Sequence, residues 1–157
     1  MKAEDQFHLG IVVDDFEETL ARLTALFGYE WCDEIGGPTA VTLPSGETSL
    51  ELRFAYSTSS PRLEIIRSVP GTVWAPAADS GIHHVGYWSD DVPADSAELV
   101  RQGCELEAAG LGPDGLPYWT YHRGKSGPRV ELVSRKVQAG LEGYWASGDL
   151  KARQASA

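Results

Sequence analysis

The sequence predicts an α+β fold built from two copies of a βαβββ module. The main observation is an internal repeat, because HLGIVVDD, which begins at His8, aligns without a gap with HVGYWSDD, which begins at His84. Each copy opens a segment that reads as a strand, then a helix, then three further strands. Each copy also ends in a strand with one glutamate between apolar neighbours, Glu64 in LEII and Glu131 in VELV. The shared order of elements indicates two equivalent halves.

The length of 157 residues suits one compact domain, in which roughly two thirds of the surface of the unfolded chain is buried. We therefore expect a single domain over residues 1–157, with a first module at about 6–70 and a second at about 81–136. A connector rich in Pro, Ala and Gly joins the two modules. The tail over 137–157 has weak periodicity, and we expect its last residues to be frayed.

The first module begins with FHLGIVV, from Phe7 to Val13, which is short and rich in β-branched residues, as a buried strand is. The next segment, DDFEETLARLTALFG, has apolar residues at helical spacing. Asp15 and Glu18 resemble a capping pair, and Gly28 can end the last turn. Turn sequences such as GGP and PSG separate or flank the extended stretches that follow. We expect these strands at Glu30–Ile35, Ser49–Ala55 and Leu63–Val69.

The second module restarts with HHVGYWSDD. Asp90, Asp91 and Pro93 mark the start of a helix, which Gly103 ends. The stretch RGKSG reads as a hairpin turn before the final strand. We expect the strands of this module at Cys104–Ala108, Pro117–His122 and Arg129–Val133.

The composition excludes several classes of partner. The formal net charge of −10 would repel a phosphate backbone, and there is no basic stripe with interleaved aromatics, so we expect no nucleic-acid partner. No apolar run reaches the ~20 residues of a membrane-spanning helix, and MKAEDQFHLG has no signal core, so we expect no membrane partner and a cytoplasmic location. Cys32 and Cys104 suit reduced thiols better than a disulfide scaffold, although a single bridge between them stays open.

Basic residues gather near the end of the expected fold. Such a cluster is typical of a solvated hairpin, and the alternative is a local seat for an anionic group such as a phosphate or a carboxylate. The residues of this basic cluster are Arg123, Lys125, Arg129, Arg135 and Lys136.

The repeat sets two histidines and two glutamates in matching places. Taken singly, a strand histidine is more often a hydrogen-bonded core residue, and a strand glutamate usually faces solvent. A carboxylate in the middle of an apolar strand is costly to bury unless it is paired or bound to a metal, and this pattern occurs twice. The joint recurrence favours a site for one divalent ion such as Zn, Co, Ni, Mn or Fe, with water in the open positions. The expected ligands are His8, Glu64, His84 and Glu131.

These segments carry a resemblance that runs from about Phe7 to Arg135 and rests on FHLGIVVDDFEET, LEII, GIHHVGYWSDD and SGPRVELV. The chain resembles the vicinal oxygen chelate superfamily, which includes glyoxalase I, methylmalonyl-CoA epimerase, extradiol dioxygenases, and bleomycin and fosfomycin resistance proteins. The resemblance implies that each module forms half of an open, barrel-like cup, whose first and last strands supply the same four ligands. It also implies a homodimer, and it leaves open whether the four ligands share one chain.

The epimerase branch looks closest, because GIHHVGYWSDD and HRGKSGPRVELV match its paired histidines, hairpin and final glutamate strand. That branch uses a glutamate on the strand before the second ligand strand as a base, and Glu51 in SLELRFA stands at the matching position. The alternatives are Glu47 as the base, or a surface carboxylate at Glu51 without a catalytic role. The segment IIRSVPGTVW departs from the epimerase pattern, in which a proline often follows soon after the second ligand, so the substrate stays open.

The resemblance implies an enzyme that transfers a proton next to a carbonyl, an epimerase or isomerase that acts through a metal-stabilised enolate. The substrate is then a small molecule, either a CoA thioester or a bulky ketone. A glyoxalase I-like lyase has the same four ligands, and a non-catalytic small-molecule binding or resistance protein shares the fold, so both stay alternatives. An extradiol dioxygenase typically uses two histidines and one glutamate, and the additional Glu64 argues against it.

Other residues with useful chemistry are given structural roles. His83 and His84 are neighbours on a strand, so their side chains are expected on opposite faces, with His83 as a structural residue beside the site. His122 is expected to be an exposed histidine of the hairpin. The aromatic side chains are expected to pack, or to line a pocket for an apolar or aromatic substrate: Trp74, Tyr87, Trp88, Tyr118, Trp119 and Tyr121.

Overall fold

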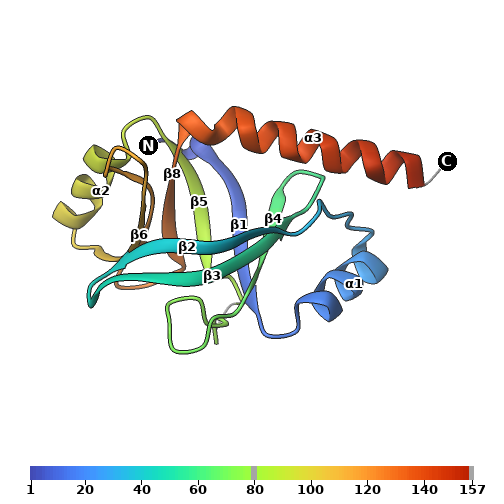
Figure 1. Ribbon diagram of the computed structural model, residues 1–157, viewed down its shortest axis with the longest axis horizontal. Helices are drawn as coiled ribbons and strands as arrows, with labels where there is room; N and C mark the ends of the chain where they lie inside the picture. Colours follow the sequence, from blue (N-terminus) through green and yellow to red (C-terminus); the bar gives the residue numbers. More distant parts are fainter. Residues whose placement is uncertain (79–80, 156–157) are drawn as a thin grey trace.

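Eight strands form a closed barrel in the computed structural model, which describes residues 1–78 and 81–155 (Figure 1). A short 3-10 turn, η1 (Ala3–Asp5), precedes the barrel, and a second, η2 (Arg135–Val137), leads into the final helix, α3 (Gln138–Ala155). Helix α1 (Phe16–Phe27) contacts β4, and helix α2 (Val92–Arg101) contacts β7 and β8. The strands are β1 (Gln6–Val13), β2 (Ile35–Leu43), β3 (Gly46–Tyr56), β4 (Arg62–Arg67), β5 (His84–Ser89), β6 (Glu105–Leu111), β7 (Pro117–Arg123) and β8 (Arg129–Ser134).

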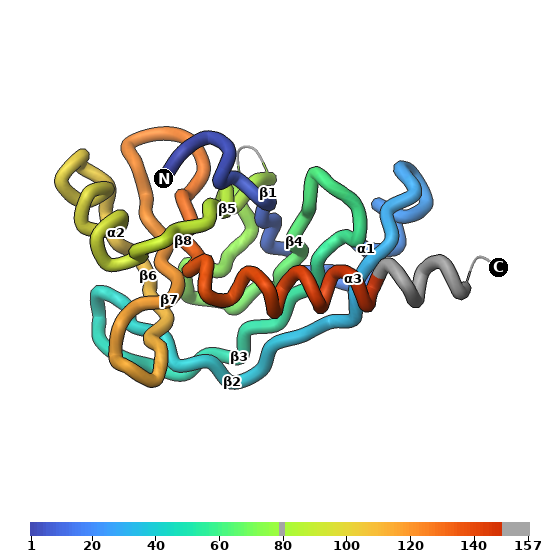
Figure 2. The backbone as a smooth tube through the Cα atoms, turned by 90° about the horizontal axis from the view of Figure 1, so that it is seen from above, coloured from blue at the N-terminus to red at the C-terminus, as the bar shows by residue number. Residues whose placement is uncertain are grey.

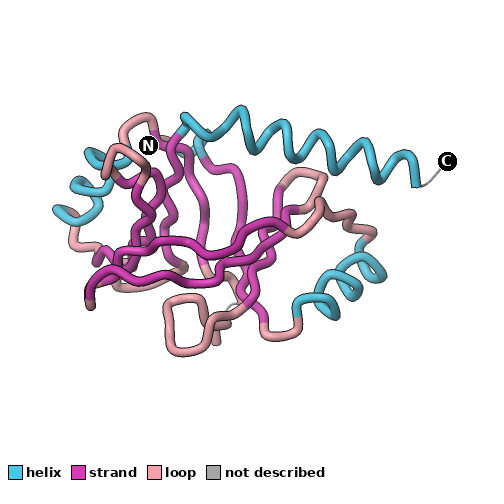
Figure 3. The backbone as a smooth tube through the Cα atoms, viewed as in Figure 1, coloured by secondary structure: helices cyan, strands magenta, loops and turns pink. Residues whose placement is uncertain are grey.

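The order of strands around the barrel divides it into two matching halves. The order is β1-β4-β3-β2-β6-β7-β8-β5, so each half has one parallel pair, β1 with β4 and β5 with β8, next to the junction between β1 and β5. The halves join where β1 pairs with β5 and where Thr42 of β2 pairs with Ala109 of β6. Figure 3 shows the strands as one continuous wall, with the helices outside it. The α+β class with two βαβββ halves is confirmed, whereas the domain and module boundaries stay predictions.

The helix ends agree in part with their sequence signals. Gly28 ends α1 in the left-handed conformation, with φ 72°, which a glycine adopts without strain. Asp91 caps α2, because its side chain accepts a hydrogen bond from the backbone N–H of Ala94. Asp15 stands at the N-cap of α1, but its side chain makes no capping hydrogen bond. The expected capping pair of Asp15 with Glu18 is therefore wrong.

The second strand of the first module differs from the expectation. A strand was expected over Glu30–Ile35 with a GGP turn after it, but β2 begins at Ile35 and runs through Gly36–Pro38. This part of β2 pairs with β3 alone, because the pair with β6 is at Thr42. The missing N–H of the proline therefore removes no hydrogen bond to a second neighbouring strand, and the proline is tolerated. Gly36 has φ 115° and lies close to the carbonyl oxygen of Leu52. A side chain at this position would clash with that oxygen.

The tail is helical where weak periodicity indicated an irregular segment. Figure 2 shows α3 running across one end of the barrel. Trp145 anchors it, since this side chain is buried against Phe7, Tyr56 and Trp88. The hydroxyl of Tyr144 donates a hydrogen bond to the backbone oxygen of Asp33. The last residues, expected to be frayed, are helical up to Ala155, and 156 and 157 lie outside the described residues.

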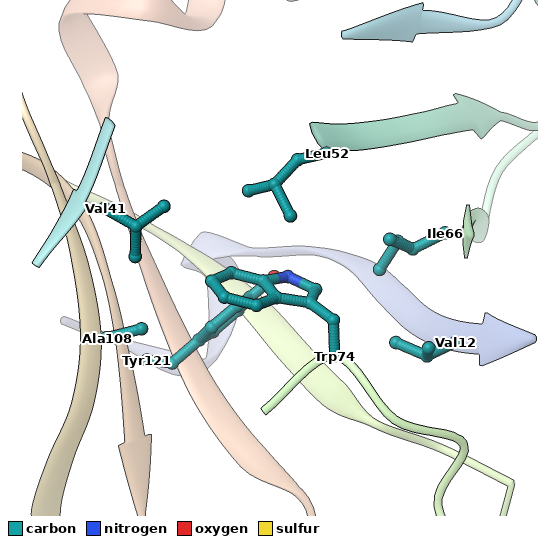
Figure 4. Packing of buried hydrophobic residues seen from close by; sticks show 7 residues of the cluster. All are labelled: Val12, Val41, Leu52, Ile66, Trp74, Ala108 and Tyr121. Atoms are coloured by element: carbon teal, nitrogen blue, oxygen red, sulfur yellow. The ribbon is translucent and has the colours of Figure 1, made fainter. Parts of the chain in front are cut away.

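Trp74 packs inside the barrel. It comes from the connector between β4 and β5, and Figure 4 shows its ring among side chains from facing strands. Its neighbours in this cluster are Val12, Val41, Leu52, Ile66, Ala108 and Tyr121. In the described part of the chain, no helix combines the length and the apolar character needed to cross a membrane.

Candidate metal centre

The structure brings the four expected ligands to one point inside the barrel. The Nε2 atoms of His8 and His84 lie 2.8 Å apart. The Oε2 atom of Glu64 lies 3.4 Å from Nε2 of His8 and 3.2 Å from Nε2 of His84. The Oε2 atom of Glu131 lies 3.1 Å and 3.5 Å from the same two nitrogens. One ligand atom from each of the four residues thus lies within 4.8 Å of the other three, and all four residues are buried.

This arrangement fits a divalent transition ion. With bonds of about 2.1 Å, two neighbouring ligand atoms around one ion are separated by about 3.0–3.4 Å, which is close to the distances found here. In the described part of the chain, the buried Oε2 of Glu131 has no hydrogen-bond partner. Two nitrogens and two carboxylate oxygens suit Zn, Co, Ni, Mn or Fe. The chemistry and the spacing of the donors fit, and the role of the four residues as metal ligands stays a prediction.

Two glycines let the histidines reach this point. His8 is paired with Gly86 across β1 and β5, and His84 is paired with Gly10. A Cβ at Gly86 would lie 1.9 Å from Cε1 of His8, and a Cβ at Gly10 would lie 1.9 Å from Cε1 of His84. Each half therefore supplies the glycine against which the imidazole of the other half lies.

The carboxylates are set by the parallel strand pairs. Gly10 is in register with Glu64 between β1 and β4, and Gly86 is in register with Glu131 between β5 and β8. The site is thus formed by two equivalent parallel strand pairs, one from each half, which meet where β1 pairs with β5. One chain supplies all four residues.

Without a metal ion, the two nearby glutamates favour the charged form of His8. Burial disfavours the charged imidazolium, but the adjacent Glu131 and Glu64 outweigh this effect and raise the pKa of His8 to about 9. Burial also disfavours the charged form of Glu64, yet His8 and His84 lower its pKa well below the usual range. A metal ion would take the place of the His8 proton.

His83 lies beside the site and orients His84. Its Nε2 is 2.7 Å from the backbone oxygen of Val73, which can only accept, so this nitrogen carries a hydrogen. Burial and the adjacent His84 lower the pKa of His83 to about 3, so its Nδ1 is an acceptor. Nδ1 of His84 lies 3.0 Å away and donates to it, which leaves Nε2 of His84 directed at the ligand cluster.

Two of the four residues, Glu64 and Glu131, line an aromatic pocket of about 390 Å³. Tyr56 is in register with Glu64, and its ring lies edge-on to His8 at 5.4 Å. Tyr121 is in register with Glu131, and its ring centroid lies 4.9 Å from that of His84. Burial and the two nearby glutamates raise the pKa of each tyrosine well above its usual value, so both phenols stay protonated. They are hydrogen-bond donors next to the ligand cluster.

Glu51 does not join the cluster. It lies on β3, where Leu52 lines the pocket, and neighbouring strand residues point to opposite faces. Its side chain is 52% exposed and forms an ion pair with Arg53, with 2.8 Å between Oε1 and Nε. Glu47 has the same parity as Glu51 on this strand and is exposed as well. The general-base role of Glu51 therefore stays a prediction without support from its position.

His122 is buried, and the expectation of an exposed hairpin histidine is wrong. It lies on β7, where the side chain faces α2, and its Nε2 is 2.9 Å from Oγ of Ser96. Helix α2 covers this face of the strand. Burial lowers the pKa of His122. The histidine is thus a packing residue between strand and helix, away from the ligand cluster.

Sequence reasoning missed the roles of four residues. Gly10 and Gly86 each follow a ligand histidine by two positions, and this match within the repeat was the signal available. Tyr56 and Tyr121 precede the ligand glutamates on the adjacent strands, but the loop lengths between each pair differ, so the repeat did not align them.

Comparisons with known proteins agree with this geometry. A family model described as the glyoxalase/bleomycin resistance protein/dioxygenase superfamily matches residues 7–119. A methylmalonyl-CoA epimerase variant of Streptomyces coelicolor, in complex with 2-nitronate-propionyl-CoA, has a TM-score of 0.57 at 20% identity, over 83% of this chain and 96% of that chain. Methylmalonyl-CoA epimerase from Mycobacterium tuberculosis has a TM-score of 0.56 at 20% identity, over 86% and 91%.

A mutant of 4-hydroxymandelate synthase from Streptomyces coelicolor is also similar, with a TM-score of 0.54 at 21% identity, over 83% of this chain and 38% of that chain. No curated protein sequence matches the chain. At these identities the likeness to solved structures shows the fold alone.

Proposed function

Because this chain belongs to the glyoxalase/bleomycin resistance protein/dioxygenase superfamily, also known as the vicinal oxygen chelate superfamily, we propose that it is a metal-dependent epimerase or isomerase. The proposed reaction is proton transfer next to a carbonyl of a small molecule. The observation that carries this proposal is the convergence of two imidazole nitrogens and two carboxylate oxygens, with both glutamates lining an aromatic pocket. The substrate classes left open by the sequence are a CoA thioester and a bulky ketone.

The proposal assigns one divalent ion to His8, Glu64, His84 and Glu131. When bound, such an ion supplies a Lewis acid that stabilises negative charge on a substrate oxygen. The apolar walls of the pocket exclude water, which strengthens every electrostatic interaction inside it. Tyr56 and Tyr121 keep their protons and would donate hydrogen bonds to a substrate oxygen that becomes more negative as its neighbouring carbon loses a proton.

The proton acceptor is the open part of the mechanism. Glu51 is the base proposed from the sequence, and its outward direction means that β3, which is paired on both sides, would have to change its orientation for Glu51 to act. Within the described lining of the pocket, the carboxylates are Glu64 and Glu131, so these are the alternative acceptors. A ligand carboxylate that accepts the proton would return it to the same carbon or to a neighbouring one, with no redox change.

Deuterium exchange tests the proposed reaction without knowledge of the natural product. Metal-loaded protein is incubated with candidate thioesters and ketones in deuterated water, and label entering next to the carbonyl is measured by mass spectrometry. We expect exchange with the intact protein and none with His84→Ala under the same metal concentration. Equal exchange in both proteins, or none with any candidate, would reject the reaction.

A non-catalytic binding or resistance protein is the second candidate. It is favoured by the outward position of Glu51, since a deep aromatic pocket without a separate base suits ligand capture. Tight binding of a ketone without label exchange would select this role. Glutathione-dependent turnover of an α-ketoaldehyde would instead identify the lyase. Homodimer formation and a cytoplasmic location stay predictions from the sequence.

A further inference from the structure

We infer, on the basis of the proposed function, that the substrate is an electrically neutral, ring-bearing ketone with a second oxygen near the carbonyl, and that it is not a CoA thioester. Three properties of the described residues carry this inference. They are the aromatic lining of the pocket, the absence of cations from that lining, and the lack of excess positive charge in the groove that adjoins it.

The lining of the pocket suits a flat, apolar body. Trp74, Trp119 and Tyr121 contact one another, with ring centroids 5.5–6.1 Å apart. Aromatic pairs at such distances contribute beyond their buried area, and a ligand ring that enters the cluster makes the same kind of contact. The remaining apolar walls come from both halves of the barrel and from α3: Ile35, Leu52, Phe54, Ile66, Val133, Val137 and Leu141.

The charge of the pocket suits a neutral ligand. Among the described residues that line it, none is Lys or Arg, and the charged ones are Glu64 and Glu131. A divalent ion would cancel these two carboxylates, so the loaded site would have no excess positive charge for a phosphate or a free carboxylate. Burying an unpaired anionic group in such surroundings is costly. Two neutral oxygens at the ion would satisfy its open positions without this cost.

A groove next to the pocket offers no excess positive charge to phosphates. A groove of about 710 Å³ adjoins the pocket, since Tyr118 and Val137 line both. Within the described part of the chain, the charged residues that line the groove are Asp90, Asp91, Asp114 and Lys136. Asp90 is ion-paired with Arg135. The remaining two carboxylates and one ammonium group leave no net positive charge that would attract the phosphates of CoA.

The other residues of the basic cluster form ion pairs or line a different cavity. Arg129 is paired with Glu107, and Arg135 is paired with Asp5 and Asp90. Arg123, Lys125 and Arg129 line a separate cavity with the connector between β4 and β5, and none of the three lines the aromatic pocket. The phosphate site that the sequence suggested as an alternative would therefore lie in a cavity separate from the metal centre.

Equilibrium binding to the zinc-loaded protein tests the inference, with calorimetry as the measurement. Dibenzoylmethane, a neutral diketone with two phenyl rings, is compared with acetoacetyl-CoA and with the N-acetylcysteamine thioester of acetoacetate, which keeps the reacting group but lacks phosphates. We expect dibenzoylmethane to bind at least tenfold more tightly than acetoacetyl-CoA. We also expect the truncated thioester to bind at least as tightly as the CoA form.

A variant links this preference to the aromatic wall. Trp119→Leu should weaken dibenzoylmethane at least tenfold and change the affinity for the truncated thioester by less than threefold. Unchanged zinc content and far-UV circular dichroism would establish that the variant is folded. Equal weakening of both ligands would overturn the role of the ring cluster.

Two outcomes separate the inference from the proposed reaction. If acetoacetyl-CoA bound more tightly than its truncated form and exchanged label in deuterated water, the substrate inference would fail and the proposed reaction would stand. If dibenzoylmethane bound tightly but no ketone or thioester exchanged label, the substrate class would stand and the reaction would fail. Absence of binding by all three probes to the zinc-loaded protein would overturn the inference.

Discussion

Gly86 lies opposite His8 across the β1–β5 pair, and the imidazole of His8 occupies the space that a side chain at Gly86 would need. The same relation holds in reverse between Gly10 and His84. The gapless match between the two halves of the sequence is thus explained by a mutual requirement. Each half supplies one of the two histidines and makes room for the histidine of the other.

Gly86→Ala should weaken zinc binding about 10- to 100-fold, as expected for a change that misorients a ligand. The added methyl carbon would lie 1.9 Å from Cε1 of His8, so the ring must move. Zinc affinity is measured by competition with a chromophoric chelator. Gly140→Ala is the matched control, because a Cβ there meets nothing within 4 Å and Ala is favoured over Gly within a helix by about 1 kcal/mol. Equal losses in both variants would contradict the explanation.

His84→Ala should abolish zinc binding or weaken it severely, because it removes a ligand and leaves the two buried carboxylates with fewer partners. His83→Ala should do less, with a loss of about 10- to 100-fold, because it removes only the hydrogen bond that orients His84. Metal content after dialysis against limited zinc distinguishes the two. A loss as large in His83→Ala as in His84→Ala would mean that His83 is itself a ligand.

Zinc affinity should rise with pH between about 6.5 and 9. The pKa of His8 is raised to about 9 in the metal-free protein, so below that pH a proton must leave before the metal binds, and affinity should change by up to about tenfold per pH unit. Calorimetry in buffers with different ionisation enthalpies measures the released proton. A flat pH profile over this range would show that His8 is not protonated in the free site.

The free energy of unfolding of the metal-free protein should fall as pH rises from about 6.5 to 9, whereas zinc affinity rises over the same range. A histidine whose pKa is raised from 6.5 to about 9 in the folded state stabilises that state below pH 6.5, and the contribution is lost as pH rises through 9. Urea unfolding in the presence of a chelator should therefore give a lower midpoint at pH 9 than at pH 6.5. His8→Asn should reduce this difference.

Glu51→Gln tests the base proposed from the sequence. If Glu51 accepts the proton, this variant keeps metal and substrate but loses about 10²–10⁴-fold in deuterium exchange. Arg53→Gln is the control, since it breaks the ion pair with Glu51 and leaves the carboxylate. Undiminished exchange in Glu51→Gln would remove it from the mechanism and direct attention to Glu64 and Glu131.

Trp145→Ala should destabilise the protein by about 3–5 kcal/mol, the usual cost of removing a buried aromatic side chain. Trp145 is 6% exposed and docks α3 against the barrel through Phe7, Tyr56 and Trp88. Chemical unfolding measures the loss. Because Val137 and Leu141 of the same terminal segment line the pocket, binding of dibenzoylmethane should weaken as well. A change in neither property would mean that α3 is not docked in solution.

The sequence by itself determined the fold class and the four residues that converge. Both follow from patterns repeated along the chain: HxGxxxDD at His8 and His84, and a glutamate in each closing strand at Glu64 and Glu131. A repeat implies equivalent positions in space, so local patterns were sufficient for these expectations.

Only the tertiary structure decided which side chains face the site and what covers it. Successive residues of a strand point to opposite faces, so a choice between Glu51 and Leu52 depends on one position of register, which β3 takes from its partners. His122 is buried because α2, distant in sequence, packs over β7. Helix α3 forms although its periodicity is weak, since burial of Trp145 against the barrel supplies the stability that local propensity lacks.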